Sequence, residues 1–268
     1  PEDTLTQDHK NLAAALQKVY EKQFLKLVKK AKYITGSENI CLGGGCAYNG
    51  VANTLAYRYF KSIHIPFAPS DAGSAIGACL TEHISISPYL GPNFQEHYVR
   101  NSLKKYTDKL IYFKMEENEL IKNVAELLAS QNIVAWFQGR MEFGARALGN
   151  RSILASPKKP EMRDKLNKVI KKREGFRPFA PSVIQEAAEA LFNLNEDVPY
   201  MNQVVKVKKE YVSKLPAITH IDDSARIQSL DSKQQPRIYS LLTQLEIDNE
   251  NPIVINTSFN LKDQTMVL

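Results

Sequence analysis

NICLGGGCAYNG, residues 39–50, is a short apolar run that leads straight into three consecutive glycines. Apolar residues at helical spacing follow, through Tyr59, so this stretch predicts a strand, a glycine loop and a helix. SIHIPF, residues 62–67, alternates as a second strand, and DAGSAIGACL, residues 71–80, is predicted to begin the next helix. Strands that alternate with helices in this way indicate an α/β fold.

The alternation continues through the rest of the chain, without an internal repeat. Few periodic apolar positions occur between residues 86 and 106, so we place a domain boundary there. We predict a first part at residues 1–90, a linker at 91–110 and a second part at 111–268. Further helices are predicted at residues 12–31, 117–130, 161–172, 185–192 and 237–245, and further strands at 133–137, 203–207, 217–221 and 252–256, with NTSFN as a polar turn.

The composition indicates a globular protein, because 43% of the 268 residues are hydrophobic. The longest apolar runs are far shorter than the roughly 20 residues of a membrane helix, so no membrane is expected as a partner. Three cysteines without a CxxC pair favour neither a disulfide framework nor a zinc site, and a cytoplasmic location is expected. Both ends of the chain resemble cuts within a longer protein.

The formal net charge of +6 suits either nucleic acid or a pocket for small polyanions. Nine Lys and Arg residues lie between Lys158 and Arg177. Acidic residues interleave with this basic block and no aromatic platform accompanies it. The block therefore favours a solvated helix face over a nucleic-acid surface.

The glycines Gly43, Gly44 and Gly45 lie where a strand meets a helix. Backbone N–H groups and the helix N-terminus favour phosphate oxygens at such a position, although the glycines would also permit a plain tight turn. The loop has neither the P-loop pattern nor a clean GxGxxG pattern. Asn49 and Asn53 lie four residues apart on the following helix and are candidates to face the same ligand, with an exposed position as the alternative for Asn53.

Asp71 lies at or next to the start of the helix in PSDAGSAIG. Aspartate is a favoured N-cap residue, so capping is the simplest role for its carboxylate. The alternative is a cation ligand, which would need further ligands from elsewhere. The chain has no HxxH or HxxxH motif, and its five histidines are scattered.

GRMEFGARALGNRSILAS, residues 139–156, and KKREGFRPFAPS, residues 171–182, are rich in arginine and lysine. Their apolar neighbours predict partial burial, and a buried guanidinium needs a partner. The nearby acids are too few, so a bound anion such as phosphate would balance the charge. Ion pairs with acids remote in sequence are the alternative. Further candidates for the same site are Arg226, Ser258 and Asn260.

In these motifs the chain resembles the O-carbamoyltransferases of the NodU/CmcH family, which modify hydroxyl groups of nodulation factors and antibiotics. Ala145 departs from the usual proline of GPRALG, which removes a φ restriction but no ligand group. The matching segments, in the family's order across nearly the whole chain, are LGGGCAYNGVAN, PSDAGSAIGA, GRMEFGARALGNRSIL, LNKVIKKREGFRPFAPSV, LPAITHIDDSARIQ and INTSFN.

The resemblance implies an α/β fold of two different parts. Residues 1–90 would be the C-terminal part of an actin-like ATPase domain (ASKHA class), similar to the tRNA threonylcarbamoyl-transfer enzymes. Residues 111–268 would form most of a YrdC-like domain. The family also has an N-terminal half with an HxxxH metal motif and further residues after NTSFN, so the chain is expected to be a fragment with an incomplete transfer site.

The resemblance also assigns roles to individual residues. Carbamoyl phosphate and ATP would form a carbamoyl-adenylate in the YrdC-like part. Gly43, Gly44, Gly45 and Asn49 would bind nucleotide in the actin-like part, where Asp71 would complete a two-histidine, one-carboxylate iron site. The residues matching the grip on the phosphates and the carbamoyl group are Arg146, Lys171, Arg177, Arg226, Ser258 and Asn260, of which the first three are the catalytic candidates, with Arg140 and Arg151 as supports of the loop.

The implied activity is ATP-dependent transfer of a carbamoyl group to a hydroxyl of a small-molecule or sugar-containing acceptor. Mg²⁺ is expected beside ATP, and Fe²⁺ would polarise the carbamoyl carbonyl. Two alternatives stay open: threonylcarbamoyl transfer to tRNA, and a nucleotide-binding module without turnover. Nucleic acid is not an expected partner of the leading hypothesis, and a homodimer is left open.

Overall fold

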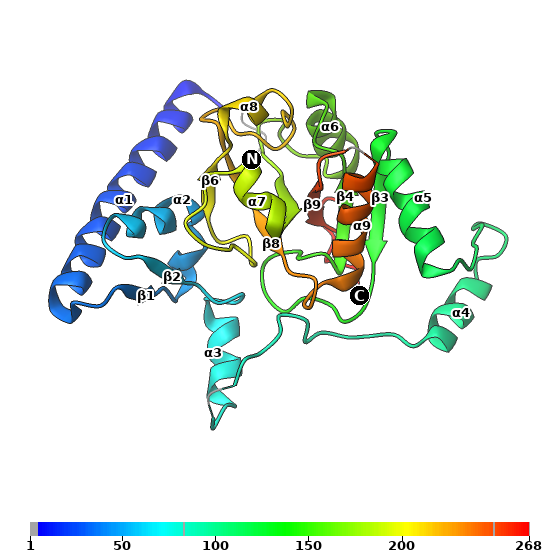
Figure 1. Cartoon of the computed structure of the whole chain (residues 1–268), viewed down its shortest axis with the longest axis horizontal. Coiled ribbons are helices and arrows are strands. Elements are labelled where there is room, and N and C mark those ends of the chain that lie inside the picture. The colour runs from blue at the N-terminus through cyan, green and yellow to red at the C-terminus, as the bar shows by residue number, and fades with distance from the viewer. Residues whose placement is uncertain (1–4, 83, 249, 268) are drawn as a thin grey trace.

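The computed structural model describes residues 5–82, 84–248 and 250–267. Helices and strands mix along the chain, as the sequence predicts. A smaller lobe, which ends at α3 (Asp71–Ala78), lies beside a larger lobe that contains the main sheet (Figure 1). Among the helices of the described residues, none is both long and apolar enough to cross a bilayer.

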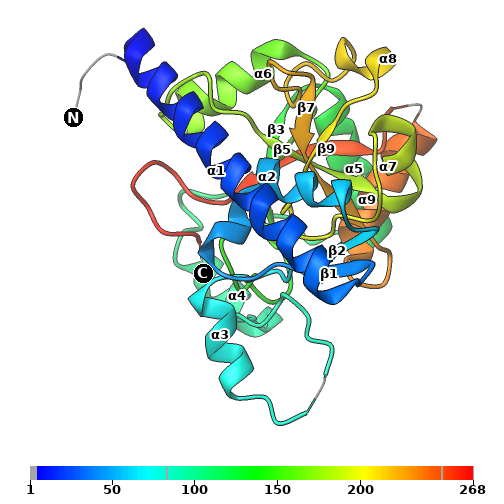
Figure 2. The ribbon, with the colours of Figure 1, turned by 90° about the vertical axis from the view of Figure 1, so that its left-hand side faces the viewer.

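The smaller lobe packs one long helix against two short parallel strands, β1 (Asn39–Cys41) and β2 (Ser62–His64). The long helix is α1 (Gln7–Thr35), which begins at a capping box on Thr6 and ends at Gly36 in the left-handed conformation. It lies along the outside of the molecule (Figures 1 and 2). The core beneath it contains Val28, Ala47, Ala56, Phe60, Ile63 and Ile65.

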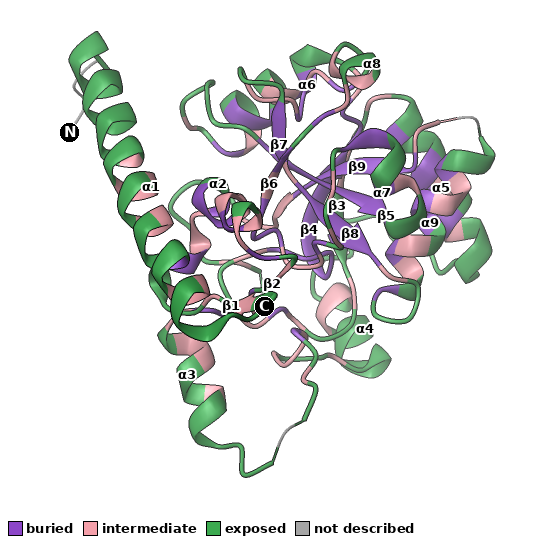
Figure 3. Cartoon of the chain, turned by 60° about the vertical axis from the view of Figure 1, so that its left-hand side comes forward, coloured by how far each residue is buried: buried purple, intermediate pink, exposed green. Residues whose placement is uncertain are grey.

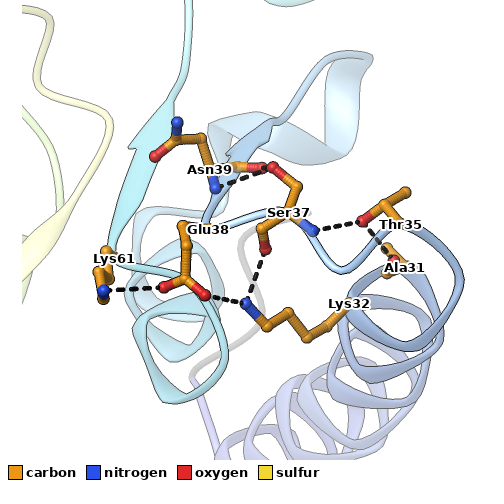
Figure 4. A network of polar contacts seen from close by, with 7 residues as sticks. All are labelled: Ala31, Lys32, Thr35, Ser37, Glu38, Asn39 and Lys61. Carbon is orange, nitrogen blue, oxygen red and sulfur yellow. Dashed lines mark hydrogen bonds and ion pairs between the residues drawn. The ribbon is translucent and has the colours of Figure 1, made fainter.

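The turn from α1 to β1 is held by a cluster of polar contacts around Glu38 (Figure 4). Lys32 donates from Nζ to Glu38 Oε1 at 2.8 Å, and Lys61 Nζ lies 3.2 Å from Glu38 Oε2. These two lysines lower the pKa of the Glu38 carboxyl. All three side chains are solvent-accessible, so the contacts direct the turn more than they stabilise the fold.

The glycine loop leads into three short helical segments before β2. Ala56 in the last of them is fully buried and packs under α1. The segments are a 3-10 helix (Gly45–Tyr48), α2 (Gly50–Asn53) and a second 3-10 helix (Thr54–Arg58).

In the described part of the larger lobe, five strands form one sheet in the order β3-β4-β9-β5-β8. Neighbouring strands are antiparallel, except that β5 and β8 are parallel. The strands are β3 (Ile133–Phe137), β4 (Arg151–Ala155), β5 (Ala180–Ile184), β8 (Gln228–Leu230) and β9 (Ile253–Ser258).

Both faces of this sheet are covered, which is why every residue of β4 and β5 is buried. Along β9, Val254 packs in the core on one face, whereas Ile253 and Ile255 pack in the core on the other. Figure 3 shows that the buried residues concentrate in this sheet. The core that contains Val254 also includes residues of α5 (Glu117–Ala129) and α9 (Pro236–Ile247). The core that contains Ile253 and Ile255 includes residues of α6 (Pro160–Lys165) and α7 (Gln185–Leu191).

The segment expected as a linker, residues 91–110, contains helix α4 (Glu96–Lys104). Just before it, residues 88–92 run along the loop that connects β3 to β4. Gly91 donates its N–H to the Met141 carbonyl at 2.9 Å, and Met141 donates to the Pro92 carbonyl at 3.0 Å. The start of this segment is therefore bound to the larger lobe.

Two predictions of local structure are wrong. Residues 217–221 form turns instead of a strand, because Ala217 and Ile218 reach the core from a turn after α8 (Lys209–Val212). The polar turn predicted at NTSFN begins too early, since β9 continues to Ser258.

The remaining strands, β6 (Val204–Lys206) and β7 (Ser224–Arg226), form an antiparallel pair.

The two lobes are joined by buried polar contacts. Glu196, between α7 and β6, accepts hydrogen bonds from the Tyr57 hydroxyl at 2.6 Å, the Ile63 N–H at 2.9 Å and the Ser62 hydroxyl at 2.7 Å. Asn53 donates from Nδ2 to the Asn202 carbonyl at 2.8 Å. A single carboxylate thus accepts three donors of the smaller lobe.

We predict that Glu196→Ala lowers the free energy of unfolding by about 1–3 kcal/mol, because three part-buried donors lose their acceptor. Urea unfolding followed by circular dichroism measures this change. The control is Glu126→Ala, which removes an exposed glutamate on α5 and is expected to change the stability by less than about 0.5 kcal/mol. Equal effects of the two substitutions would contradict the role of Glu196.

Candidate functional site

The loop between β3 and β4, residues 138–150, is called the arginine loop below. Glu142 is buried within it and gathers its backbone. Its Oε1 accepts hydrogen bonds from the N–H groups of Leu148 at 2.7 Å, Asn150 at 2.8 Å and Arg151 at 3.3 Å. One carboxylate therefore sets the path of the second half of the loop.

The carbonyl of Leu148 anchors the arginine loop to its surroundings. It accepts from the hydroxyl of Tyr89 at 3.2 Å, from Gln228 Nε2 at 3.1 Å and from Gln235 Nε2 at 3.0 Å. These donors come from the segment before α4, from β8 and from the start of α9. The loop is thus held by three separate parts of the chain.

Arg140 and Arg151 bind the protein itself. Arg140 donates from Nη2 to the Leu90 carbonyl at 2.7 Å. Arg151 is fully buried, donates from Nη1 to the Gln138 carbonyl at 2.7 Å, and places its guanidinium carbon 3.6 Å from the centre of the Phe137 ring. Both side chains support the loop, as the resemblance implies.

Lys171, Ser258 and Asn260 are brought together from distant parts of the sequence. The Lys171 ammonium lies 3.0 Å from Ser258 Oγ, 2.5 Å from the Ser258 carbonyl, 2.9 Å from Asn260 Oδ1 and 3.1 Å from the Asn260 carbonyl. Burial, together with the charge of Arg173, lowers the pKa of Lys171 to about 8. This lysine is therefore a cation in a poorly hydrated place.

Arg226 lies near Arg146 and also near Arg173. Burial, and then the charges of Arg146 and Arg173, lower the pKa of Arg226 to about 10. The buried Nε atoms of Arg146 and Arg226 have no hydrogen-bond partner within the described residues. The ion pairs found among those residues include none of the three arginines. The alternative of ion pairs between these arginines and acids remote in sequence is thus not found among the described residues.

A π-helix (Leu166–Ile170) continues α6 and delivers Lys171 to the site. The N–H of Lys171 bonds to the Leu166 carbonyl at 2.9 Å, and Lys172 then turns the chain with a left-handed φ of 44°. A π-helix is rare and is frequently found at functional sites. Here it places two cations, Lys171 and Arg173, on the same side of the larger lobe.

Arg173 lies near Lys171 and Arg226, although the sequence analysis did not name it as a site residue. Its Nε donates to Asn167 Oδ1 at 2.8 Å, and its guanidinium carbon lies 4.8 Å from the centre of the Phe179 ring. Asn167 is fully buried and donates from Nδ2 to the Arg177 carbonyl at 2.9 Å. The position of Arg173 two residues after Lys171 was the available signal.

Arg177 does not enter the buried cluster. Its side chain is about half exposed, and its Nε lies 2.8 Å from Glu174 Oε2. Its charge nevertheless contributes to lowering the pKa of Arg173, so the two lie close together. The proposed contact of Arg177 with substrate stays a prediction.

The basic block at residues 158–177 divides into two kinds of cation. Lys158 pairs with Glu250, and Lys168 lies 3.6 Å from Asp164, so these two follow the solvated-face interpretation. Lys171 turns inward instead.

The three glycines of the smaller lobe form an exposed loop. Gly44 has a φ of 85°, which favours glycine, and donates its N–H to the Pro69 carbonyl at 2.6 Å. A Cβ added at Gly43, Gly44 or Gly45 would meet no atom within 4 Å. The loop is therefore open to a ligand, while the tight-turn explanation is sufficient for Gly44.

The asparagines after this loop are engaged within the protein. Asn49 accepts the Ala52 N–H at 3.2 Å as the N-cap of α2 and donates from Nδ2 to Gln17 at 2.9 Å. Asn53 is fully buried, and its Nδ2 binds the Ala47 carbonyl at 2.7 Å as well as the larger lobe. Asn53 is therefore not exposed, and its amide nitrogen does not face a ligand. The interpretation of Asn53 as an exposed residue is wrong.

Asp71 is the first residue of α3, and Ser70 occupies the N-cap position. Its side chain is exposed and makes no capping hydrogen bond, although a carboxylate in the first turn suits the helix dipole. Among the residues that the structure describes, no three His, Cys, Asp or Glu side chains are placed to hold a metal ion. A single carboxylate does not build an iron site.

Comparisons with known proteins agree on one family. The family model described as Carbamoyltransferase C-terminus matches residues 125–268, and the one described as Carbamoyltransferase N-terminus matches residues 2–80. Nodulation protein NolO of Bradyrhizobium diazoefficiens is 35% identical, with 98% of this chain and 50% of that protein covered. Nodulation protein U of the same organism is 32% identical, with 97% of this chain and 45% of that protein covered.

An uncharacterized protein of Synechocystis is 40% identical, with all of this chain and 49% of that protein covered. The chain spans about half the length of these curated relatives. The C-terminal family model alone matches more than half of the chain. The chain belongs to the carbamoyltransferase family.

Proposed function

We propose that the protein of which this chain is part transfers a carbamoyl group to a hydroxyl of a small-molecule or sugar-containing acceptor, at the expense of ATP. The observation that carries this proposal is the cluster of Arg146, Lys171, Arg173 and Arg226, which has no carboxylate partner in the described chain. Such a cluster is suited to bind the phosphate groups of ATP and carbamoyl phosphate.

The first half-reaction would convert carbamoyl phosphate, ATP and water into carbamoyl-adenylate, phosphate and pyrophosphate. Water first cleaves the bond that joins the carbamoyl and phosphate groups of carbamoyl phosphate, which gives carbamate and phosphate. A carbamate oxygen then bonds to the α-phosphorus of ATP while the bond from that phosphorus to pyrophosphate breaks. Negative charge develops on phosphate oxygens, where fixed guanidinium groups stabilise it without reorganisation. In the second half-reaction the acceptor hydroxyl attacks the carbamoyl carbon, and AMP leaves.

Lys171, Ser258 and Asn260 supply two kinds of group to such a site. The ammonium offers positive charge, and the hydroxyl and amide offer neutral hydrogen bonds. The three side chains bind one another, with the Ser258 hydroxyl donating to Asn260 Oδ1 at 2.6 Å. Rotation of these side chains would exchange mutual contacts for contacts with a phosphate or carbamoyl group.

The finer features of the proposal rest on the resemblance. The smaller lobe would be part of an actin-like ATPase domain that binds nucleotide at Gly43–Gly45, and the larger lobe would be YrdC-like. Mg²⁺ would accompany ATP, and Asp71 would meet Fe²⁺ only with ligands beyond the described residues. A cytoplasmic location and a possible homodimer belong to the same set of proposals.

We predict that Arg146→Ala and Lys171→Met each reduce pyrophosphate release by the full-length enzyme at least about a hundredfold, because charge developing on the phosphates loses a fixed cation. The assay couples pyrophosphate release from ATP to added carbamoyl phosphate. Lys168→Met is the matched control, since Lys168 is an exposed lysine on the same helical segment. Near-normal release by either variant would contradict the phosphate role.

We also predict that anion binding takes up protons near pH 8. The pKa of free Lys171 is about 8, and a bound anion raises it, so the lysine is half protonated when free and protonated when bound. Affinity for pyrophosphate should therefore fall as the pH rises above 8. Calorimetry at pH 8 in buffers of different ionisation enthalpy measures the uptake, which should disappear in Lys171→Met. An unchanged uptake in that variant would assign the proton to another group.

A further inference from the structure

Tyr48 of the smaller lobe lies against the arginine loop of the larger lobe. The guanidinium carbon of Arg146 is 5.5 Å from the centre of the Tyr48 ring, within the range of a cation–π contact. Arg146 has a buried Nε atom without a hydrogen-bond partner in the described residues. The aromatic ring is thus a specific contact that the smaller lobe makes with this side chain.

The Tyr48 ring is held from both ends. Its backbone closes the 3-10 helix after the glycine loop, and its hydroxyl lies 3.4 Å from Ser70 Oγ at the start of α3. The glycine loop is bound to the same turn, because Gly44 donates its N–H to the Pro69 carbonyl at 2.6 Å. The position of the ring is therefore set by the smaller lobe.

The arginine loop meets that same turn. Gly144 has a φ of 127°, and a Cβ placed there would lie 3.1 Å from the carbonyl oxygen of Phe67. Glycine allows this close approach of the two backbones. The approach brings Arg146, two residues later, within reach of Tyr48.

A ring face suits Arg146 better than a carboxylate would. Arg146 lies beside Arg226 and lowers its pKa, so the like charges repel each other. A carboxylate would relieve the repulsion but would also occupy the guanidinium N–H groups and compete with an incoming anion. An aromatic face attracts the cation without accepting those N–H groups in their plane.

We propose that Tyr48 is a positioning residue for the anion site, which keeps the Arg146 guanidinium in the cluster with its N–H groups free for a phosphate ligand. The site of the larger lobe is then completed by a side chain of the smaller lobe. This inference rests on the proposed function only in taking the cluster as a phosphate site.

Calorimetric titration of the protein with inorganic pyrophosphate tests the inference. Tyr48→Leu should weaken binding by roughly three- to tenfold, the value of a part-exposed cation–π contact. Tyr48→Phe, which keeps the ring, should retain most of the affinity. Tyr33→Leu is the control, because Tyr33 is 90% exposed on α1, and its affinity should be unchanged. If Tyr48→Leu does not fold, as judged by thermal unfolding, Tyr48→Met carries the same expectation.

A double-mutant cycle separates positioning from general support of the fold. If Tyr48 acts through Arg146, Tyr48→Leu should cause no further loss of affinity in an Arg146→Ala background. An equal loss in both backgrounds, or normal affinity of Tyr48→Leu alone, would overturn the inference while leaving the anion site intact. Absence of pyrophosphate binding by the unaltered protein would overturn both the inference and the proposed site.

Discussion

The burial of cations is the constraint on which the larger lobe depends. Burial lowers the pKa of Arg146, Lys171, Arg173 and Arg226, and the charge of a neighbouring cation lowers it further for the last three. Buried cations need hydrogen-bonding or charged partners, and the partners found here are polar or aromatic but uncharged. The partners present are the oxygens of Ser258 and Asn260 around Lys171, Asn167 and Phe179 around Arg173, and Tyr48 beside Arg146.

The sheet supplies the rigidity that such an arrangement needs. Asn256 in β9 donates from Nδ2 to the Ser182 hydroxyl at 2.9 Å, and that hydroxyl donates to Gln228 Oε1 at 2.7 Å. Gln228 in turn holds the Leu148 carbonyl of the arginine loop. A buried polar chain therefore runs across three strands to the loop that carries Arg146. In a low-dielectric interior, hydrogen bonds of this kind fix geometry strongly.

The sequence predicts the regular parts of this fold well, and the reasons are local. The apolar stripe and terminal glycine of α1 predict its helix, and the continuous apolar run of β3 predicts its strand. The structure confirms both predictions. Strands β4, β5, β7 and β8 were not predicted. Arg151 opens β4 and Pro181 lies inside β5, and both residues are tolerated there only because of tertiary contacts. Arg151 is held by carbonyls, and in β5 a proline ordinarily argues against a strand.

At residues 217–221 the error is the opposite one, because a strand was predicted where the structure has turns. Residues 217–221 have the composition of a strand, yet their apolar side chains fill the core from a turn. Apolar content at short range cannot distinguish these two solutions, because both bury the same side chains. The partner strand is what decides, and its position is not encoded within the segment itself.

The candidate site was predictable as a set of motifs but not as an arrangement. Lys171 meets Ser258 and Asn260 across about ninety residues of chain, and only the resemblance connects the three. Asn53 was considered for a ligand because it follows a glycine loop. Its burial depends on the Asn202 carbonyl of the other lobe, which no pattern around Asn53 reveals.

Arg140, Arg146 and Arg151 show why a surplus of charge counted along the sequence overstates the charge that is free to meet a ligand. Arg140 and Arg151 donate N–H groups to the carbonyls of Leu90 and Gln138. The Nε atom of Arg146 has no such partner in the described chain, and the aromatic ring of Tyr48 lies beside its guanidinium. Chemically identical side chains within twelve residues therefore differ in their contacts, because distant segments supply different partners.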